Sequence, residues 1–380
     1  MLKNKFAFLL AGLINNYNFI VIFSCAYSLS KINPYINPSL IILSEIVPGF
    51  ITQILYTKYL YNVPYTYRWI FLFSTQILSS LFLIIQTNIA LLFTSIALIS
   101  INTYLGESSM LSLSTFYDQK EMKFWSMGTG LARLCGTGFY LVMDRWLDVR
   151  IIFGINLLIY LIGYSIVLYL LDYRNKIQNI NQEKPVALEP LEYKLSEAQE
   201  NIEAPSVISR SDTCSDTCSS WSHCSFWKKH FEFFGNVQSL TIAYFLSYFL
   251  GFAYIPLLVK SDFEYQICQF ITGIAIFFGR ISGNYIKVER IKLFTLIHLY
   301  SLLSIIIFTV SIYMKLELPI LLINLMLFIT YFINGTAYPI VYNYIYKTYT
   351  EDKEWHMGLV GQYTCLFMII GCLIGYPLQL

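Results

Sequence analysis

Eleven stretches of about 20 mostly apolar residues recur along the chain, and they limit its fold more than any other feature. A helix of that length spans the hydrocarbon core of a bilayer. Of the 380 residues, 56% are hydrophobic and only 13% are charged, whereas a soluble domain carries about 25% charged residues. The sequence therefore predicts an all-α polytopic membrane protein. The predicted spans cover residues 6–29, 39–58, 68–87, 89–116, 125–143, 151–172, 235–259, 265–285, 293–313, 318–338 and 355–378.

Charge and cysteine content exclude several other classes of protein. A net charge of +2 provides no basic field for nucleic acid. The eight cysteines have irregular spacings and form no disulfide framework. The apolar run after Lys3 and Lys5 is too long for a signal peptide, so we expect it to be retained as the first span.

The basic residues predict the orientation of the chain in the membrane. With a cytosolic N-terminus, 19 of the 25 Lys and Arg residues fall on the cytosolic side, five on the opposite side, and Arg133 within a span. The long loop 173–230 holds seven of the cytosolic Lys and Arg residues. Without this loop, twelve basic residues lie on the cytosolic side and five on the opposite side. Because Lys and Arg are concentrated in cytosolic loops, we expect a cytosolic N-terminus and a C-terminus on the other side.

The polar segment 173–230 divides the spans into six and five. Its composition and lack of periodicity predict a disordered cytosolic linker, through which protein partners bind in one interpretation. It separates an N-terminal six-helix bundle (1–172) from a C-terminal five-helix bundle (231–380). The segment also holds Cys214, Cys218, His223 and Cys224, for which zinc binding, acylation and no chemistry are the alternatives. Their spacing fits no standard zinc finger, so we predict no metal and no other cofactor.

A repeated motif relates the two bundles. Trp-Ser-Met-Gly at 125–128 opens the fifth span, and Trp-His-Met-Gly at 355–358 opens the eleventh, so Trp125 corresponds to Trp355. The shift between these two tryptophans is the repeat offset. Two parallel repeats of six spans, here with the last span missing, are the plan of the major facilitator fold, whose substrate site lies between the halves. We therefore predict a major-facilitator-like protein of eleven transmembrane helices in two pseudo-repeated bundles.

Several motifs and single residues of the chain resemble those of a known protein family. Single matching residues are Tyr244, Tyr248, Arg280, Gly335, Ala337 and Tyr338. The longer motifs are Gly-Leu-Ile-Asn-Asn at 12–16, Glu-Ile-Val-Pro at 45–48, Gly-Glu at 106–107, Leu-Ser-Leu-Ser-Thr-Phe-Tyr at 111–117, and Trp-Ser at 125–126 with Gly-Thr-Gly at 128–130. Together these residues resemble the battenin family of lysosomal and vacuolar membrane proteins. The resemblance runs from about residue 8 to residue 376, with the linker unmatched.

The resemblance implies a transporter-type protein of lysosomal or vacuolar membranes that acts in organelle pH homeostasis and basic amino acid (arginine) transport. A glycerophosphodiester exporter is one alternative, and a non-transporting scaffold or trafficking regulator is another. No pattern of catalytic residues favours an enzyme. The chain departs from the family where Ser247 replaces a Glu and Arg133 replaces a Gly. It also ends without the prenylatable Cys box of animal members, so we expect no prenyl anchor.

Glu107 and Arg133 are the leading candidates for a substrate or proton site, because an ionisable group within a span is costly and usually functional. At about 1.5 Å per residue, both lie roughly 14–15 Å from the cytosolic face, so an antiparallel helix pair brings them into contact. In one interpretation Glu107 carries a proton or binds substrate and Arg133 attracts an anion. In the other they form a purely structural ion pair. Their repeat positions are Ala337 and Tyr363, so the pair has no symmetric copy.

Three further ionisable residues have two interpretations each. Glu45, just before Pro48, is either a gating or proton-access group beside a helix kink or a carboxylate that snorkels to the interface. Arg280 is either a topology anchor or a substrate ligand. His298 either titrates in proton coupling or is a hydrogen-bonded structural residue.

Uncharged polar residues complete the candidate set. Asn15, Asn16, Ser112 and Thr115 either bind a polar substrate or join helices by hydrogen bonds, and Tyr244 and Tyr248 enter through the family resemblance. The glycines at 128, 130, 136 and 138 follow no strand and are expected to allow close helix packing. The expected partners are therefore a small-molecule substrate, protons and the lipid bilayer.

Overall fold

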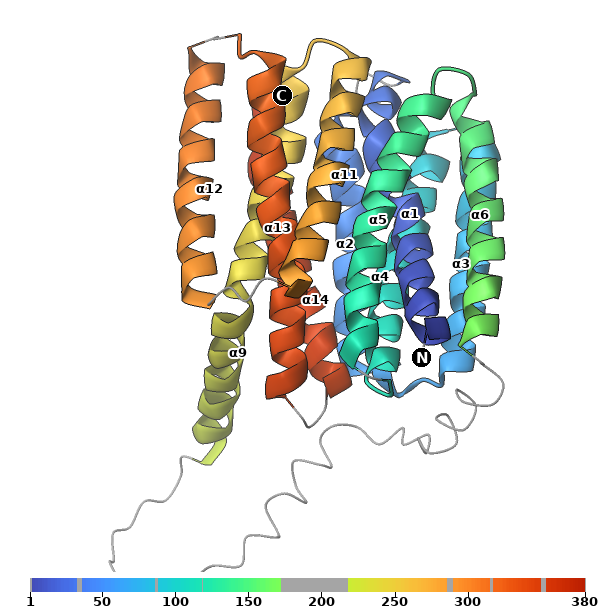
Figure 1. Cartoon of the computed structure of the whole chain (residues 1–380), viewed down its shortest axis with the longest axis vertical. Helices are drawn as coiled ribbons and strands as arrows, with labels where there is room; N and C mark the ends of the chain where they lie inside the picture. Colours follow the sequence, from blue (N-terminus) through green and yellow to red (C-terminus); the bar gives the residue numbers. More distant parts are fainter. Residues whose placement is uncertain are drawn as a thin grey trace, which may run out of the picture.

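The computed structural model describes residues 2–32, 36–85, 88–117, 119–171, 218–285, 290–314, 317–349 and 353–379. Long helices run up and down in one bundle, with the N-terminus at the lower end and the C-terminus near the upper end of the view in Figure 1. In chain order they are α1 (Leu2–Ile32), α2 (Pro38–Lys58), α3 (Tyr65–Ile85), α4 (Ile89–Ser114), α5 (Gln119–Met143), α6 (Val149–Leu170), α9 (Cys218–Tyr248), α11 (Asp262–Tyr285), α12 (Arg290–Tyr313), α13 (Ile320–Thr348) and α14 (Lys353–Gly375). The π-helix η3 (Phe249–Tyr254) and α10 (Ile255–Leu258) continue α9, and the short turns η1 (Leu60–Asn62) and η4 (Tyr376–Gln379) complete the elements.

The all-helical prediction is confirmed, and eight of the described helices are long and apolar enough to cross a membrane. They begin at Leu2, Pro38, Tyr65, Ile89, Val149, His230, Ile320 and Glu354. The helices α5, α11 and α12 fall outside this set. Two of these, α5 and α11, carry the buried residues Arg133 and Arg280, which lower their hydropathy. The exact division into six and five spans therefore stays a prediction, as do the bundle boundaries at 172 and 231.

Two predicted boundaries differ from the structure. The helix α9 begins at Cys218, within the predicted linker 173–230, because residues 218–230 contain neither Pro nor Gly to interrupt a helix. The span predicted at 318–338 continues as α13 to Thr348, through Pro339. Burial of Val341, Tyr342 and Ile345 in the next turn offsets the hydrogen bond that a proline removes.

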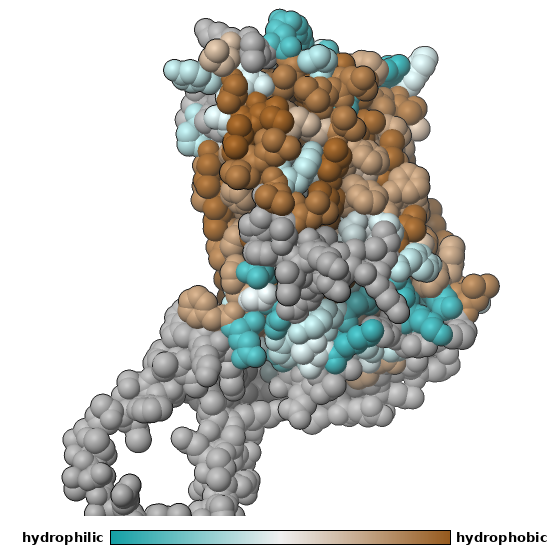
Figure 2. Space-filling model, turned by 60° about the vertical axis from the view of Figure 1, so that its left-hand side comes forward, coloured by the Kyte–Doolittle hydropathy of each residue, from teal (hydrophilic) through white to brown (hydrophobic). Residues whose placement is uncertain are grey.

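The outer surface is apolar, as a bilayer-facing surface requires. Figure 2 shows a broad hydrophobic band on the side of α12, with hydrophilic residues above and below it. The exposed side chains of α12 in this band are Leu296, Leu299, Leu302, Leu303, Ile306 and Val310. Exposed apolar patches of this size mark contact with a membrane or a partner, so the band supports insertion in a bilayer.

Contacts between the two halves of the chain follow the sequence repeat. The helix α5 packs against α11, and α2 packs against α14. The repeat offset that leads from Trp125 to Trp355 places α2 on α11 and α5 on α14, so these two interfaces are pseudo-symmetric copies of each other. The arrangement confirms two pseudo-repeated bundles.

Close packing at the predicted glycines is also confirmed. Where α1 crosses α5, a Cβ atom on Gly12 would lie 2.5 Å from the carbonyl oxygen of Trp125, and a Cβ atom on Gly128 would contact the carbonyl oxygen of Leu9. Because only glycine leaves room for backbone against backbone, this crossing holds the core of the N-terminal half together.

Arg68 holds the turn between α2 and α3 at the lower end of the bundle. It is 2% exposed, whereas most arginines are exposed. Its guanidinium donates to the carbonyl oxygens of Val63 (2.8 Å) and Tyr61 (2.6 Å) and to the hydroxyl of Tyr56 (3.1 Å). Tyr56 also shares a hydrogen bond with Ser112 of α4. The network therefore connects the turn to two helices.

Replacing Arg68 by Ala is expected to lower the free energy of unfolding by about 3 kcal/mol, because it leaves buried carbonyl groups without donors. The melting temperature of the detergent-purified protein, followed by size-exclusion chromatography after heating, measures the loss. Arg68→Lys, which keeps the charge but not the planar fork of donors, is expected to recover only part of it. An unchanged melting temperature in both variants would contradict this role.

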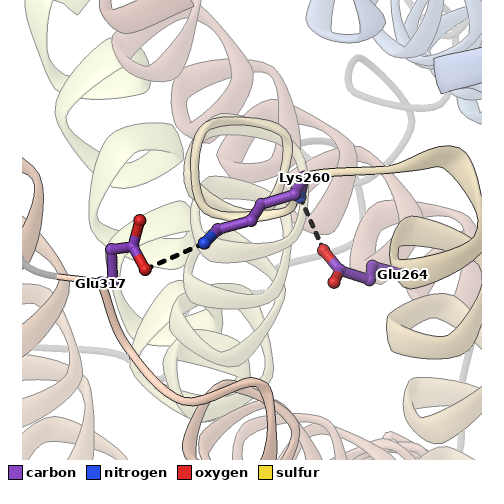
Figure 3. Close-up of polar contacts among 3 residues, drawn as sticks. All are labelled: Lys260, Glu264 and Glu317. Atoms are coloured by element: carbon purple, nitrogen blue, oxygen red, sulfur yellow. Dashed lines mark hydrogen bonds and ion pairs between the residues drawn. The ribbon is translucent and has the colours of Figure 1, made fainter.

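An exposed ion pair lies at the upper end, between α10 and α13. The ammonium group of Lys260 donates to the carboxylate of Glu317 (2.9 Å), and the backbone N–H of Lys260 donates to Glu264 (2.6 Å) (Figure 3). The hydrogen bond and charge of Glu317 raise the pKa of Lys260. On the basic side, Lys260 therefore stays charged up to and beyond the ordinary lysine pKa, and the pair is lost there only at strongly basic pH. Since both side chains are largely solvated, the pair contributes little to stability.

Candidate functional site

A small cavity lies between the two halves of the chain. Its volume is about 50 Å³, enough for a few water molecules. Helices α1, α2 and α4 line it from the N-terminal half, and α9, α13 and α14 line it from the C-terminal half. Polar and aromatic side chains make up most of its wall: Asn16, Phe19, Gln53, Thr103, Tyr104, Glu107, Tyr244, Tyr248, Tyr338, Tyr342, Thr364 and Met368.

Glu107 is the charged residue that lines this cavity. Its carboxylate accepts a hydrogen bond of 2.6 Å from the hydroxyl of Tyr338, which comes from α13 in the other half of the chain. The guanidinium of Arg280 lies over the ring of Tyr338, 3.9 Å from the ring centroid, and interacts electrostatically with Glu107. Arg280 is 8% exposed, and its Nε and Nη1 have no hydrogen-bond partner. Glu107 and several hydroxyl groups thus line the cavity, and the cation Arg280 lies over the ring of Tyr338, outside the cavity lining.

The structure does not bring Glu107 and Arg133 together as predicted. Of the described residues, Arg133 contacts Thr272 through a hydrogen bond of 3.3 Å, and its guanidinium lies 4.8 Å from the ring centroid of Tyr331. The prediction is wrong because α5 packs against α1 and α11, whereas α4 packs against α2 and α3. Equal depth in consecutive helices is therefore no guide to contact here.

Arg280 takes the place next to Glu107 that the sequence assigns to Arg133. Its burial within the bundle does not fit the interpretation as a topology anchor at the membrane surface. A Cβ atom on Gly130 would lie 3.1 Å from Cδ of Arg280, so the arginine side chain packs against the glycine one turn below Arg133. The ligand interpretation of Arg280 therefore stands.

Asn15 and Asn16, which are adjacent in the sequence, have different roles. Asn15 donates to the carbonyl oxygen of Thr103 (2.9 Å) and accepts from the hydroxyl of Tyr164 (2.8 Å), so it joins α1 to α4 and α6. Asn16 lines the cavity. The structural interpretation thus fits Asn15, and the substrate interpretation fits Asn16.

Ser112 and Thr115 lie away from the cavity. Ser112 bonds to Tyr56 of the Arg68 network, and Thr115 donates to the carbonyl oxygen of Ser112 (2.7 Å) at the end of α4. Ser112 therefore fits the helix-joining interpretation, whereas the bond of Thr115 stays within the end of α4 and fits neither interpretation. Tyr244 and Tyr248 of α9, in contrast, line the cavity.

The remaining predicted residues lie elsewhere. Glu45 is fully buried in α2 and does not line the cavity. His298 belongs to α12, but its side chain lies outside the described residues. The same holds for Cys214 and for the side chains of Cys218, His223 and Cys224. Within the described part of the chain, no three His, Cys, Asp or Glu side chains are grouped to hold a metal ion.

Polar contacts join the two halves above and below the cavity. Below it, Gln362 of α14 donates to Thr57 and to the carbonyl oxygen of Gln53. Above it, Tyr265 of α11 donates to the carbonyl oxygen of Phe23 (3.3 Å), and Gln266 donates to Asp144 (2.7 Å). Polar contacts thus hold the two halves together on both sides of the cavity.

Tyr338 is the most important cavity residue that the sequence analysis does not predict as a site residue. The repeat offset makes Glu107 correspond to Ala337. The observed partner of Glu107 is Tyr338, the residue that follows Ala337. The hydrogen bond between Glu107 and Tyr338 therefore joins nearly equivalent positions of the two repeats. Gln53, Tyr104 and Tyr342 are also missed, since uncharged residues within a span carry no signal of their own.

Comparison with known proteins identifies relatives of the chain. The family model described as CLN3 protein matches residues 6–380. Protein btn-1 of Neurospora crassa is 31% identical over 149 residues, which cover 38% of this chain and 32% of that protein. Protein BTN1 of Kluyveromyces lactis is 30% identical over 175 residues, which cover 45% of this chain and 43% of that protein. The chain thus spans only about a third to two fifths of the length of these curated relatives. The matches confirm the resemblance to the battenin family.

A solved structure shares the fold. The crystal structure of a D-xylose-proton symporter matches with a TM-score of 0.61 over 98% of this chain and 89% of that chain, at 10% sequence identity. At so low an identity the match speaks for the fold alone. It confirms the predicted major-facilitator-like architecture.

Proposed function

The chain belongs to the CLN3 protein family, and on that premise we propose that it is a lysosomal or vacuolar membrane transporter that carries a small solute through the cavity between its two halves. The single observation that carries the proposal is the hydrogen bond between Glu107 and Tyr338 at the cavity, with Arg280 over the ring of Tyr338. It joins a charged group of the N-terminal half to the C-terminal half in the cavity wall. A charged group inside a membrane bundle marks a substrate or proton pathway.

The chemistry of the cavity suits a solute that carries both charges. Glu107 offers an acceptor for a cationic group, and the unpaired Nε and Nη1 of Arg280 offer donors for a carboxylate. Four of the tyrosines, Tyr104, Tyr248, Tyr338 and Tyr342, are at most 5% exposed and surround the site with hydroxyl groups and rings. A basic amino acid such as arginine fits this set, and its transport would affect organelle pH through exchange of charge and protons.

A glycerophosphodiester is the second candidate solute. Arg280 favours it, because a guanidinium binds a phosphodiester as readily as a carboxylate. In that case Glu107 repels the substrate unless it is protonated, so uptake would fall as pH rises. The third candidate, a scaffold or trafficking regulator, depends on residues 173–230, most of which lie outside the described residues.

Alternating access follows from the way the halves meet. The cavity has room only for water, so a solute needs the two halves to move apart at one end. The contacts of Gln362 below the cavity and of Gln266 above it are few and polar, and breaking one set opens one end. This is the rocking of two bundles about a central site that the major facilitator fold supports.

Uptake by purified protein in liposomes tests the proposal. We expect accumulation of labelled arginine above the level of empty liposomes, with the rate changing when a pH gradient is imposed. A labelled glycerophosphodiester is offered in parallel. Uptake of that solute alone would assign the second candidate, and uptake of neither by folded protein would favour the scaffold.

A further inference from the structure

Glu45 is a buried carboxylate that the central cavity does not use. It lies in the upper part of α2 and is fully buried, and neither of its carboxylate oxygens has a hydrogen-bond partner. Ser100 of α4 bonds only to its backbone carbonyl. An ionised carboxylate without donors is very costly in an apolar interior. The arrangement around Glu45 therefore suits a neutral, protonated carboxylic acid.

Arg133 provides the positive charge that acts on Glu45. The titratable groups that face Glu45 in the described chain are Cys25 of α1, Tyr104 of α4, Arg133 of α5 and Tyr248 of α9. The helix α14 also packs against α2 and brings Cys365 and Cys372 next to Tyr104 and Tyr248. Arg133 is the single cation of this group, so it is the group that responds most strongly when Glu45 loses a proton.

Arg133 reaches across the interface to the other half of the chain. Its Nε donates to the hydroxyl of Thr272 in α11 (3.3 Å), and its guanidinium lies over the ring of Tyr331 in α13. Its Nη2 is buried and has no hydrogen-bond partner. One guanidinium thus has two competing partners, namely the C-terminal half, which it contacts, and Glu45, which it does not.

From this geometry we infer that Glu45 is a proton-binding site and that Arg133 is a latch controlled by that proton. With the proton on Glu45, Arg133 binds Thr272 and Tyr331 and joins the two halves above the cavity. When the proton leaves to the solution at the upper end, the Glu45 carboxylate attracts Arg133. The guanidinium then exchanges its contacts with the C-terminal half for an ion pair within the N-terminal half.

The latch acts at the end of the interface where the other contacts between the halves are neutral or partly exposed. Ser39 of α2 donates to the carbonyl oxygen of Phe252 (3.0 Å), which receives no helical hydrogen bond from Pro256 because proline has no N–H. Tyr265 and Gln266 supply the remaining bonds. Loss of the Arg133 contact removes the one bond of this set that is made by a buried cation, so release favours opening of the upper end. The inference rests on the proposed function for its place in a transport cycle, but the proton-controlled opening does not require that any solute be carried.

A distance measured across the upper end tests the latch. Spin labels on p-acetylphenylalanine at Trp146, between α5 and α6, and at Tyr313, at the end of α12, leave the native cysteines in place; both positions are more than 80% exposed. In nanodiscs between pH 5 and pH 8, pulsed electron paramagnetic resonance is expected to show a short distance at low pH and a longer one at high pH. The ratio of the two populations changes by up to about tenfold per pH unit for one linked proton.

Variants separate the latch from other effects of pH. Glu45→Gln, which resembles the protonated acid, is expected to keep the short distance at every pH. Arg133→Gln is expected to show the longer distance with little dependence on pH. Glu317→Gln, at the exposed pair with Lys260, is the matched control and should behave as the wild type.

Two outcomes would overturn the inference, namely a wild-type distance that ignores pH and a Glu45→Gln distance that follows pH as the wild type does. Failure of solute uptake, with the distance change intact, would instead count against the proposed function alone. A Glu45→Gln protein that loses the short distance at all pH values would show that the residue is structural, and would also overturn the latch.

Discussion

Glu107→Gln is expected to lower solute uptake about 10- to 100-fold. This is the loss expected when one hydrogen bond between the solute and a charged carboxylate is weakened. The amide has nearly the same size as the carboxylate, and its oxygen still accepts from Tyr338, so the contact between the halves is kept. Only the negative charge at the cavity is removed. We therefore expect a melting temperature close to that of the wild type, with the loss seen in initial rates of arginine uptake into liposomes.

The control is Glu264→Gln, which neutralises a partly buried carboxylate at the upper end, away from the cavity, and should transport normally. Tyr338→Phe tests the other partner: it removes the donor to Glu107 but keeps the ring beneath Arg280, so a smaller loss is expected. Wild-type uptake in Glu107→Gln would show that the cavity is not the solute pathway. A large drop in melting temperature would instead support the structural interpretation of the Glu107 charge.

The fold is more predictable than the site because hydropathy and repeats are properties of single segments. Eight spans, the pseudo-repeat and the packing of Gly128 against α1 follow from apolar length, from the motif shared by Trp125 and Trp355 and from glycine spacing. Boundaries fail where tertiary burial outweighs a local rule, as at Pro339, which does not end α13. The predicted end of the linker at residue 230 is wrong for a related reason. Polar composition does not prevent residues 218–230, which lack Pro and Gly, from forming the first turns of α9.

The site depends on which helices touch, and that is not a property of any segment. Both Glu107 and Arg133 are recognisable as buried charges, but their hydrogen-bond partners come from α13 and α11, far away in the chain. Arg68 shows the same limit, because an arginine at a span end looks like a surface anchor until its carbonyl partners are seen. The repeat offset leads to within one residue of Tyr338, and the family resemblance includes Tyr338 itself but gives it no role.

Gly335→Leu is expected to abolish folding, and Gly335→Ala to lower the free energy of unfolding by about 1–3 kcal/mol. Gly335 faces α11 at the point where α13 crosses it. A Cβ atom there would lie 2.7 Å from the carbonyl oxygen of Ile276 and 3.1 Å from Cα of Gly279. These are backbone atoms that cannot rotate away, so α11 and α13 must separate. Since α11 also carries Arg280 and packs on α5, the damage reaches the cavity and the interface between the halves.

Gly235→Ala is the matched control, and it should act in the opposite direction. Gly235 lies in α9, and a Cβ atom there meets nothing within 4 Å. Alanine is a better helix former than glycine by about 1 kcal/mol, so this variant should be as stable as the wild type or more stable. Thermal stability and the monodisperse fraction on size-exclusion chromatography measure both changes. Equal losses in Gly335→Ala and Gly235→Ala would point to a general requirement for glycine flexibility, whereas opposite signs show that the α11–α13 crossing depends on the absence of a side chain.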